Sequence, residues 1–393
     1  MHMIKLTHRQ LFFALLDGKQ PDKLPFFPDI SDWYKGRRQP PNEPQAYNTG
    51  ALIPDDSVLN KNQIDMPPEF ASWRYLDFYR NFDWGLPVHI YHTDWLKEHH
   101  DGYQYSKESN PEGSIQIWET PHGTLKRIDR TASDGSSINT KYMLQSLDDF
   151  KALEYIINHT YYEPDYGLID WNLKTIGEMG VADVVIWRSP FGKFMQEYAG
   201  LVQLAYWMAD DAPRVLDLVT LQAEHDMQVI EMAAKSKARL IIISDHADEA
   251  LLNPRWYKQY CIPFYRQATD HLHKHGKLVS THLDGNIKRL MPLLKETGFD
   301  LLDGTTPAPM TNWTPAELAP HLSEKMYAYC GVPSTFFAQN LPDEQILASA
   351  EEIVSALHGR VILNVGDVLP GNGNLKQVIG LGDWSRKVFS AVS

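Results

Sequence analysis

Short apolar segments alternate with longer amphipathic segments over most of the chain after residue 145. The apolar segments have the length of buried strands, whereas the amphipathic segments repeat with the helical period of 3.6 residues. Strands that alternate with helices in this way pair in parallel through helical crossovers. Six strands are predicted, at 181–187, 240–244, 277–281, 299–302, 326–329 and 361–365, with helices between them at 213–238, 254–275, 287–297 and 343–358.

Two earlier apolar runs, at 24–27 and near 88–91, bring the number of predicted strands to eight. Eight parallel strands with helical crossovers favour a closed (β/α)8 TIM barrel over an open, doubly wound sheet. Barrels of this kind often exceed the usual domain size as one unit. We therefore predict an α/β fold in which residues 1–393 form a single barrel domain.

The segments around the first two predicted strands depart from this repeat. Thr7 can cap an N-terminal helix that Gly18 ends, which predicts an extension before the barrel. Residues 36–72 are rich in Pro, Asn and Asp and have no clean period, which predicts a loop or lid on the rim of the barrel. Alternating runs at 115–120 and 124–128 flank a Gly-containing turn and predict a β-hairpin excursion.

Composition narrows the class of protein further. The formal net charge of −13 argues against a nucleic-acid-binding surface, which needs clustered Lys and Arg. The chain has only two cysteines, Cys261 and Cys330, so a disulfide framework is excluded and a reducing compartment fits. No stretch approaches the roughly 18 apolar residues of a membrane span, and the N-terminal segment lacks the features of a signal peptide. We expect a soluble, cytoplasmic protein, with a homodimer left open.

Polar side chains follow nearly every predicted strand. In a barrel enzyme the active site forms at the C-terminal ends of the strands, so these residues should converge on one rim. A single Asp in such a position often only caps the next helix, and it is the convergence of many that predicts a site. The candidates are Asp29, Trp33, Tyr34, Arg188, Asp245, His246, His282, Asp284, Asp303 and Asp367.

Some of these residue types are able to hold a metal ion. His282 and Asp284 follow the same strand, and His246 and Asp367 follow others, from which they could approach. A set of histidine and carboxylate groups suits Zn²⁺ or a harder divalent ion. The alternative is a metal-free, hydrogen-bonded polar pocket.

A second group of histidines has a simpler explanation. His271, His273 and His275 end a predicted helix, where cationic or donor side chains interact favourably with the helix dipole. We therefore do not expect them to bind a metal.

Several phrases of the sequence resemble those of the uroporphyrinogen decarboxylase superfamily. ALLDGKQPDKLP at 14–25 is similar to the family's entry of helix, Gly and Pro-Asp-Arg-Val-Pro. THLDGNI at 281–287 resembles its "His-x-Cys-Gly" strand end, and GDVLP at 366–370 resembles its C-terminal "Gly-Cys-x-x-Pro". TPHGT at 120–124 is similar to a phrase of the family's methyltransferase members. The resemblance extends over nearly the whole chain and implies a TIM barrel.

Departures from the family's patterns limit what the resemblance implies. The decarboxylases open with an arginine-rich loop for the substrate's carboxylates, whereas this chain has the acidic and aromatic string FPDISDWY at 27–34, which would repel a polyanionic tetrapyrrole. The methyltransferase members hold zinc with one His and two Cys. Here the resemblance gives His282 with Asp284 and Asp367, and this exchange of thiolate for carboxylate hardens the site.

The resemblance therefore implies a methyltransferase that moves a methyl group between a small organic substrate and a corrinoid (cobalamin) cofactor. The chain has no Asp-x-His-x-x-Gly corrinoid motif of its own, so a partner protein would deliver the cofactor. Two alternatives remain open, a lyase or decarboxylase of a small acid with Arg188 as carboxylate clamp, and a ligand-binding barrel without catalysis. We expect the residues to divide into a catalytic set of Asp245, His246, His282 and Asp284, a substrate-binding set of Asp29, Trp33, Tyr34, Arg188 and Asp303, and a metal-binding set of His282, Asp284 and Asp367.

Overall fold

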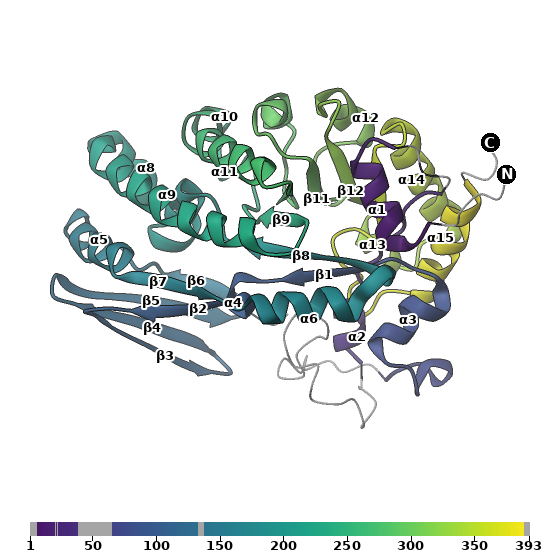
Figure 1. The fold of residues 1–393 in the computed structure, drawn as a ribbon, viewed down its shortest axis with the longest axis horizontal. Coiled ribbons are helices and arrows are strands. Elements are labelled where there is room, and N and C mark those ends of the chain that lie inside the picture. Colours follow the sequence, from purple (N-terminus) through teal and green to yellow (C-terminus); the bar gives the residue numbers. More distant parts are fainter. Residues whose placement is uncertain (1–5, 20, 22, 38–64, 133–136, 389–393) are drawn as a thin grey trace.

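A curled parallel sheet of seven strands forms the centre of the molecule (Figure 1). The computed structural model describes residues 6–19, 21, 23–37, 65–132 and 137–388. Neighbouring strands follow one another in chain order, and every pair is parallel. The strands are β1 (Leu86–Ile90), β8 (Gly180–Ile186), β9 (Leu240–Ile243), β10 (Leu278–His282), β11 (Leu301–Thr305), β12 (Tyr327–Gly331) and β13 (Val361–Asn364).

Helices connect these strands and cover the outside of the sheet (Figure 1). Most positions of the strands are buried, as expected of a parallel sheet with both faces covered. The longer connecting helices are α6 (Tyr166–Ile176), α8 (Leu201–Asp210), α9 (Ala212–Lys235), α11 (Ile262–Lys274), α14 (Asp343–Ala356) and α15 (Leu375–Val388). Shorter ones are α2 (Ser31–Lys35), α3 (Tyr75–Phe82), α4 (His92–Trp95), α7 (Pro190–Lys193), α10 (Pro254–Trp256), α12 (Pro315–Leu318), α13 (Ser334–Ala338), the π-helical segments η5 (Phe194–Tyr198) and η6 (Tyr257–Cys261), and the 3-10 helices η2 (Pro68–Phe70), η3 (Leu147–Asp149), η4 (Gly177–Met179), η7 (Met291–Glu296) and η8 (Ala319–His321).

The predicted first strand at 24–27 is not a strand of the sheet. It makes one isolated parallel bridge, between Phe26 and Leu363 of β13, and its other neighbour is Gly85, whose N–H donates to the Phe26 carbonyl over 3.0 Å. Pro25 and Pro28 have no N–H to donate, so the ladder cannot continue in either direction. The prediction of a TIM-barrel-like α/β fold is confirmed, but the prediction of a barrel closed by eight strands is wrong.

Helix α1 (His8–Leu16) covers the N-terminal ends of the strands. Thr7 caps the helix, as predicted from the sequence, and it forms a capping box with Gln10. The apolar face of the helix packs with residues near the starts of several strands, among them Val181, Leu240 and Leu301. The opposite, C-terminal ends of the strands are therefore left for the functional site.

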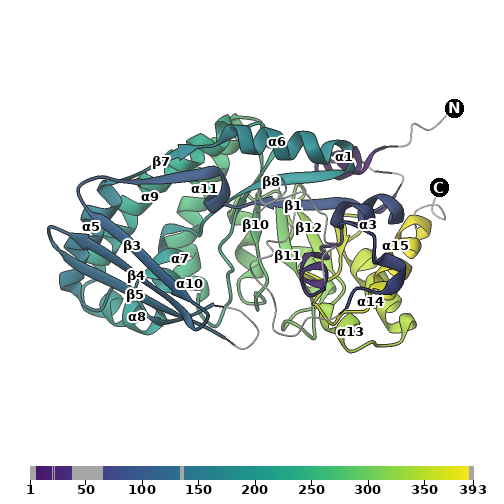
Figure 2. The same cartoon turned by 90° about the horizontal axis from the view of Figure 1, so that it is seen from below.

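An insertion between β1 and β8 adds a second layer of structure. The predicted hairpin is confirmed as β4 (Gly113–Thr120) and β5 (Gly123–Thr131), and it belongs to a four-stranded antiparallel sheet that the sequence did not predict. From below, this sheet lies on one side of the molecule, the strands β10 to β12 lie near its middle, and α13 to α15 lie on the other side (Figure 2). The remaining elements of the insertion are β2 (Leu96–His100), β3 (Gln104–Asn110), β6 (Ser137–Lys141), β7 (Thr160–Pro164) and α5 (Phe150–Asn158), which packs on β4, β5 and α9.

The predicted loop at 36–72 falls mainly outside the described residues, which exclude 38–64. Its last part, after Asp65, contains the short helix η2. The prediction of a rim loop or lid stays a prediction.

The end of β12 and the segment after β13 lie so close together that a substitution there can test the arrangement of the strands. A Cβ atom on Gly331, at the end of β12, would lie 2.0 Å from the amide nitrogen of Gly366. We expect Gly331→Ala to lower the free energy of unfolding by about 1–3 kcal/mol or more, since neither backbone can yield. Denaturant unfolding would measure this change.

The matched control is Gly380→Ala in helix α15, where a Cβ atom would meet nothing within 4 Å. This substitution should raise the free energy of unfolding by about 0.5–1 kcal/mol, because alanine is the better helix former. Equal effects of the two substitutions would contradict the close approach of β12 to the segment after β13.

Candidate functional site

His282, the last residue of β10, lies at the centre of a polar cluster on the C-terminal rim. Its Nδ1 atom is 2.7 Å from Oδ2 of Asp303, which is paired with it in register on β11. Both side chains are largely buried. This hydrogen bond fixes the orientation of the ring and directs its other nitrogen, Nε2, away from Asp303.

A glycine makes room for this ring. Gly304 follows Asp303 with a φ of +68°, and a Cβ atom there would lie 2.4 Å from the ring of His282. Both the positive φ and the close approach require glycine. The irregular register between β11 and β12 falls in the same segment, between Leu302 and Thr305.

Two carboxylates face the free nitrogen of His282. Oδ2 of Asp284 and Oδ1 of Asp367 each lie 3.7 Å from Nε2. Asp284 is the second residue after β10, whereas Asp367 is brought from the segment after β13. The curled sheet thus gathers on one rim residues that lie more than eighty positions apart in the sequence.

His246 completes the cluster from the segment after β9. Its Nδ1 atom lies 3.1 Å from Oδ2 of Asp284, its Nε2 atom lies 3.0 Å from Oγ of Ser244, and its ring centroid is 4.6 Å from that of His282. Its φ of +49° is left-handed. Such a backbone conformation is uncommon for a residue other than glycine and is concentrated at functional sites.

The cluster shifts the ionisation of its members. Burial alone would raise the pKa of Asp284, but hydrogen bonds with His246 and His282 hold that pKa well below its usual range. Burial would lower the pKa of His282, but Asp284, Asp303 and Asp367 raise it well above its ordinary value. Burial raises the pKa of Asp367 to about 6.

The distances around His282 Nε2 fit a metal ion. Ligand atoms that share a tetrahedral zinc ion at about 2.0–2.2 Å lie roughly 3.3–3.6 Å from one another. The 3.7 Å separations of His282 Nε2 from the two carboxylates are close to this value. Among the described residues, the rim group whose ligand atoms all lie within 4.8 Å of one another consists of His246, His282 and Asp284, so His246 is a further candidate, whereas Asp367 lies outside this group. The contact from Asp303 to the far side of His282 is typical of a metal-binding histidine.

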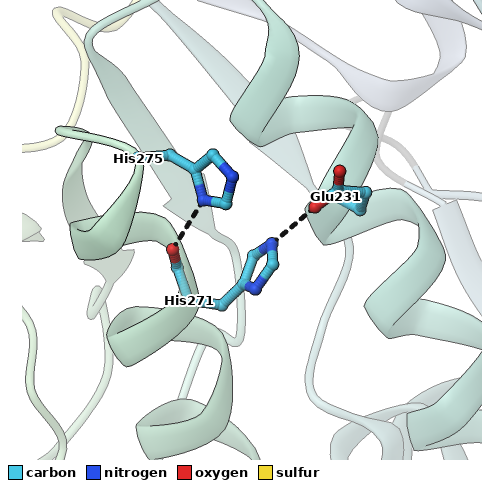
Figure 3. A group of neighbouring side chains, drawn as sticks. All are labelled: Glu231, His271 and His275. Atoms are coloured by element: carbon cyan, nitrogen blue, oxygen red, sulfur yellow. Dashed lines mark hydrogen bonds and ion pairs between the residues drawn. The ribbon is translucent and has the colours of Figure 1, made fainter.

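A second group able to hold a metal lies elsewhere among the described residues (Figure 3). Nε2 of His271 lies 2.7 Å from Oε2 of Glu231, and Nδ1 of His275 lies 3.0 Å from the carbonyl oxygen of His271, to which it can donate a hydrogen bond. Lys235 also contacts the Glu231 carboxylate, at 3.0 Å. This group is on α9 and the end of α11, just before the start of β10, at the end of the sheet opposite to His282. We assign it to the contact between the two helices.

Three residues predicted to bind substrate lie in the hydrophobic core or beside it. Trp33 and Tyr34 are fully buried against Phe78, and the Trp33 indole donates a hydrogen bond to the carbonyl of Gly373. Asp29 accepts a hydrogen bond from the backbone N–H of Ser31, and burial raises its pKa. The structure therefore brings Asp303, but not these two aromatic side chains, to His282.

Asp245 precedes His246 but has different neighbours. It is buried and accepts a hydrogen bond from the hydroxyl of Tyr265, and its other oxygen faces Gly192. Gln196 donates to its backbone carbonyl over 3.2 Å. Asp245 thus lies behind the rim, where it connects the segment after β9 to α7 and α11.

Arg188 lines a cavity of about 370 Å³ beside the cluster. The cavity lies between the ends of β8 and β9 and the insertion, and His246 belongs to its lining. The guanidinium group of Arg188 is engaged, with Nη1 3.2 Å from Oε1 of Glu197 and Nε 3.0 Å from Oε1 of Gln196.

A largely buried ion pair between β1 and β8 was not predicted from the sequence. Nδ1 of His89 on β1 lies 2.9 Å from Oδ2 of Asp183, its register partner on β8. The sequence did hold a signal for this pair, because the otherwise apolar strands β1 and β8 each contain one titratable residue. Burial would lower the pKa of His89, but the contact with Asp183 raises it to about 10.

The fold and the rim cluster together define a TIM-barrel-like α/β protein with a polar site at the strand ends. The model of the family "Uroporphyrinogen decarboxylase (URO-D)" matches residues 186–386, which hold six of the seven strands in whole or in part. The chain belongs to this family. A search of curated protein sequences found no match. No helix in the described part of the chain has the length and apolar character needed to cross a membrane.

Solved structures share the fold. A methyltransferase from Methanosarcina mazei is 13% identical, with a TM-score of 0.59 over 98% of this chain and 100% of that one. A putative vitamin-B12-independent methionine synthase from Listeria monocytogenes is 13% identical over 56% of this chain and 66% of its own, with a TM-score of 0.38. The first likeness shows the fold alone, and the second is too weak to carry an argument.

The His89–Asp183 pair gives a test of the barrel interior. We expect Asp183→Ala to lower the free energy of unfolding by about 2–4 kcal/mol at pH 6, because it leaves the buried imidazolium of His89 unpaired. Because the pKa of His89 is raised, the stabilisation is complete below the unfolded value of about 6.5 and declines as pH rises through about 10. The effect of the substitution should therefore be smaller at pH 10, as measured by denaturant unfolding at both values.

The matched control is Asp270→Ala, which removes an exposed pair with Arg266 on helix α11. This change should cost less than about 0.5–1 kcal/mol at either pH. A loss on Asp183→Ala that is as small as that of the control would contradict a stabilising ion pair.

Proposed function

We propose that this protein is a methyltransferase that moves a methyl group between a small organic substrate and a corrinoid carried by a partner protein. The arrangement of His282 carries the proposal, with Asp303 behind the ring and Asp284 and Asp367 before it. The likeness in fold to the Methanosarcina mazei structure, which is described as a methyltransferase, supports it over nearly the full length of both chains.

The residues that would hold a metal are His282 through Nε2, Asp284 through Oδ2 and Asp367 through Oδ1. Three protein ligands leave a position open, as in catalytic zinc sites. Bound there, a zinc ion would supply Lewis acidity to the heteroatom that carries the methyl group. Carboxylates in place of thiolates suit an oxygen or nitrogen heteroatom better than a sulfur.

His246 is suited to handle the proton of the reaction. When a methyl group leaves a heteroatom for the corrinoid, that heteroatom must gain a proton, and the proton must be lost again in the reverse direction. The imidazole lies between the rim carboxylates and the cavity, where a substrate would sit. Asp245 would act as a positioning residue, since it fixes the segment on which His246 lies.

The contacts around the site disfavour the decarboxylase alternative. A small carboxylic acid needs a free cation, but Arg188 is already paired with Glu197. The carboxylates of Asp284 and Asp367 would also repel an anion at the rim. A neutral substrate avoids both problems.

Elemental analysis of the purified protein tests the metal site. We expect about one zinc per chain in the wild type and loss of that zinc in His282→Ala, because Nε2 is the central ligand of the group. His271→Ala, which alters the second histidine group, serves as the matched control and should retain the metal. Absence of zinc from the wild type after incubation with Zn²⁺ would overturn the metal part of the proposal.

The contact between Asp303 and His282 makes a separate prediction. We expect Asp303→Asn to weaken zinc affinity about 10- to 100-fold in a chelator competition, because the carboxylate both orients the ring and increases its basicity. The control is Asp300→Asn, which alters a similar contact with His273 at the other end of β11. Equal zinc affinities in the two variants would contradict a supporting role for Asp303.

Methyl transfer itself is tested with free corrinoid in place of the partner's. Zinc-loaded wild type should form methylcobalamin from reduced cobalamin and a panel of neutral methylated compounds, as measured by absorbance. The His282→Ala variant should not. Retained metal with no methyl transfer from any compound of the panel would instead favour a ligand-binding barrel.

A further inference from the structure

The cavity beside His246 has walls from two separate parts of the fold. One wall consists of the ends of β8 and β9 with the helices α7, η5 and α9 between them, and the other consists of the insertion, through β4, β7 and α5. Its volume of about 370 Å³ lies within the range of small-molecule sites, which is about 300–1,000 Å³. The insertion follows the C-terminal end of β1, so it rises on the same side of the sheet as the rim cluster.

Aromatic and aliphatic side chains form most of the lining. The rings of Tyr162 and Trp187 lie 5.0 Å apart, and the ring of His92 meets Trp187 edge-on at 5.3 Å. From the insertion, Ile156 and Trp118 face the same space. Rings of this kind bury large areas and pair with other rings at centroid distances of about 4.5–7 Å.

The charged groups of the cavity are already paired inside the protein. Nζ of Lys193 lies 2.8 Å from Oδ1 of Asp226 and 4.0 Å from the centroid of the Trp187 ring. Gln222 donates to the same Asp226 oxygen and accepts from the hydroxyl of Tyr198. With Arg188 paired to Glu197, each cation has its own carboxylate, and an anionic ligand would have to displace one.

We propose that this cavity binds an uncharged, flat, largely apolar molecule of two or three rings, covered by the insertion. His246 contributes to both the cavity and the rim cluster, so a group at that end of the molecule would face His282 and Asp284. That this molecule is the methyl donor rests on the proposed function, whereas its binding does not.

A pair of fluorescent probes with one skeleton tests the proposal. N-phenyl-1-naphthylamine is uncharged, and 8-anilino-1-naphthalenesulfonate adds a sulfonate to the same rings. With metal-free full-length protein, we expect saturable fluorescence enhancement by the uncharged probe and at least about tenfold weaker binding of the sulfonate, because every cation of the cavity is already paired. Equal affinities would overturn the assignment to uncharged ligands.

Two substitutions locate the bound probe. Ile156→Trp on α5 places a larger side chain in the cavity and should weaken binding of the uncharged probe at least about tenfold. Ile138→Trp on β6 adds the same bulk to an exposed position of the insertion, 54% exposed, and should leave binding unchanged. If Ile156→Trp does not fold, Ile157→Phe on the same helix makes a smaller change of the same kind.

The outcomes separate this proposal from the proposed function. Unchanged probe binding in a folded cavity variant, or equal losses in the cavity and control variants, would overturn the cavity as the binding site. Binding that the cavity variant abolishes, in a protein that holds no zinc and transfers no methyl group, would confirm the cavity and reject the methyltransferase. Because the probes are measured without metal, failure of one proposal does not imply failure of the other.

Discussion

The hydrogen bond between His282 and Asp303 is the contact on which the rim cluster depends. It joins the ends of two adjacent parallel strands, and it exists because β10 and β11 pair in a register that places the two residues side by side. A shift of one residue would turn one of them to the other face of the sheet. Gly304 supplies the space for the ring, so the backbone of β11 and the orientation of His282 are fixed together.

The polar interior of the barrel follows from the same arrangement. Asp183 and Asp303 are buried, Asp29 and Asp367 are partly buried, and each influences the ionisation of at least one neighbour. The histidines His89 and His282 are the main cationic partners of these carboxylates among the contacts described. Carboxylates that lie close together with few cations near them either hold protons or attract a metal ion. The raised pKa of Asp367 and the proposed zinc site both follow from this grouping of carboxylates.

The sequence predicted what depends on the repeat of strands and helices. Because the carboxyl ends of parallel strands meet on one rim, His246, His282, Asp284, Asp303 and Asp367 could be grouped without coordinates. The same rule placed Trp33 and Tyr34 on the rim because both follow the predicted strand at 24–27. That segment makes only one isolated bridge with the sheet, and the two aromatic side chains are buried in the core.

Other features had no local signal in the sequence. The strand β3 is polar and mostly exposed on both faces, so its alternation is too weak to indicate a sheet of four strands. The cavity is lined by side chains from Tyr91 to His246, which only the tertiary fold brings together. His89 and Asp183 are each a single charged or titratable residue in an apolar strand. Neither strand alone shows why the residue is there, because the two residues form an ion pair only when the strands lie side by side.

The two halves of the site come from different parts of the chain. The insertion between β1 and β8 supplies one wall of the cavity, whereas the residues around the proposed metal position all come from segments after β9. Under the two proposals, the part of the ligand surface that the insertion supplies is thus encoded apart from the reactive groups, although His246 belongs to both the cavity and the rim cluster. An exchange of the insertion with that of a relative could therefore redirect the protein to a different compound and leave its reactive centre intact, which makes this segment a natural unit for diversification and for engineering.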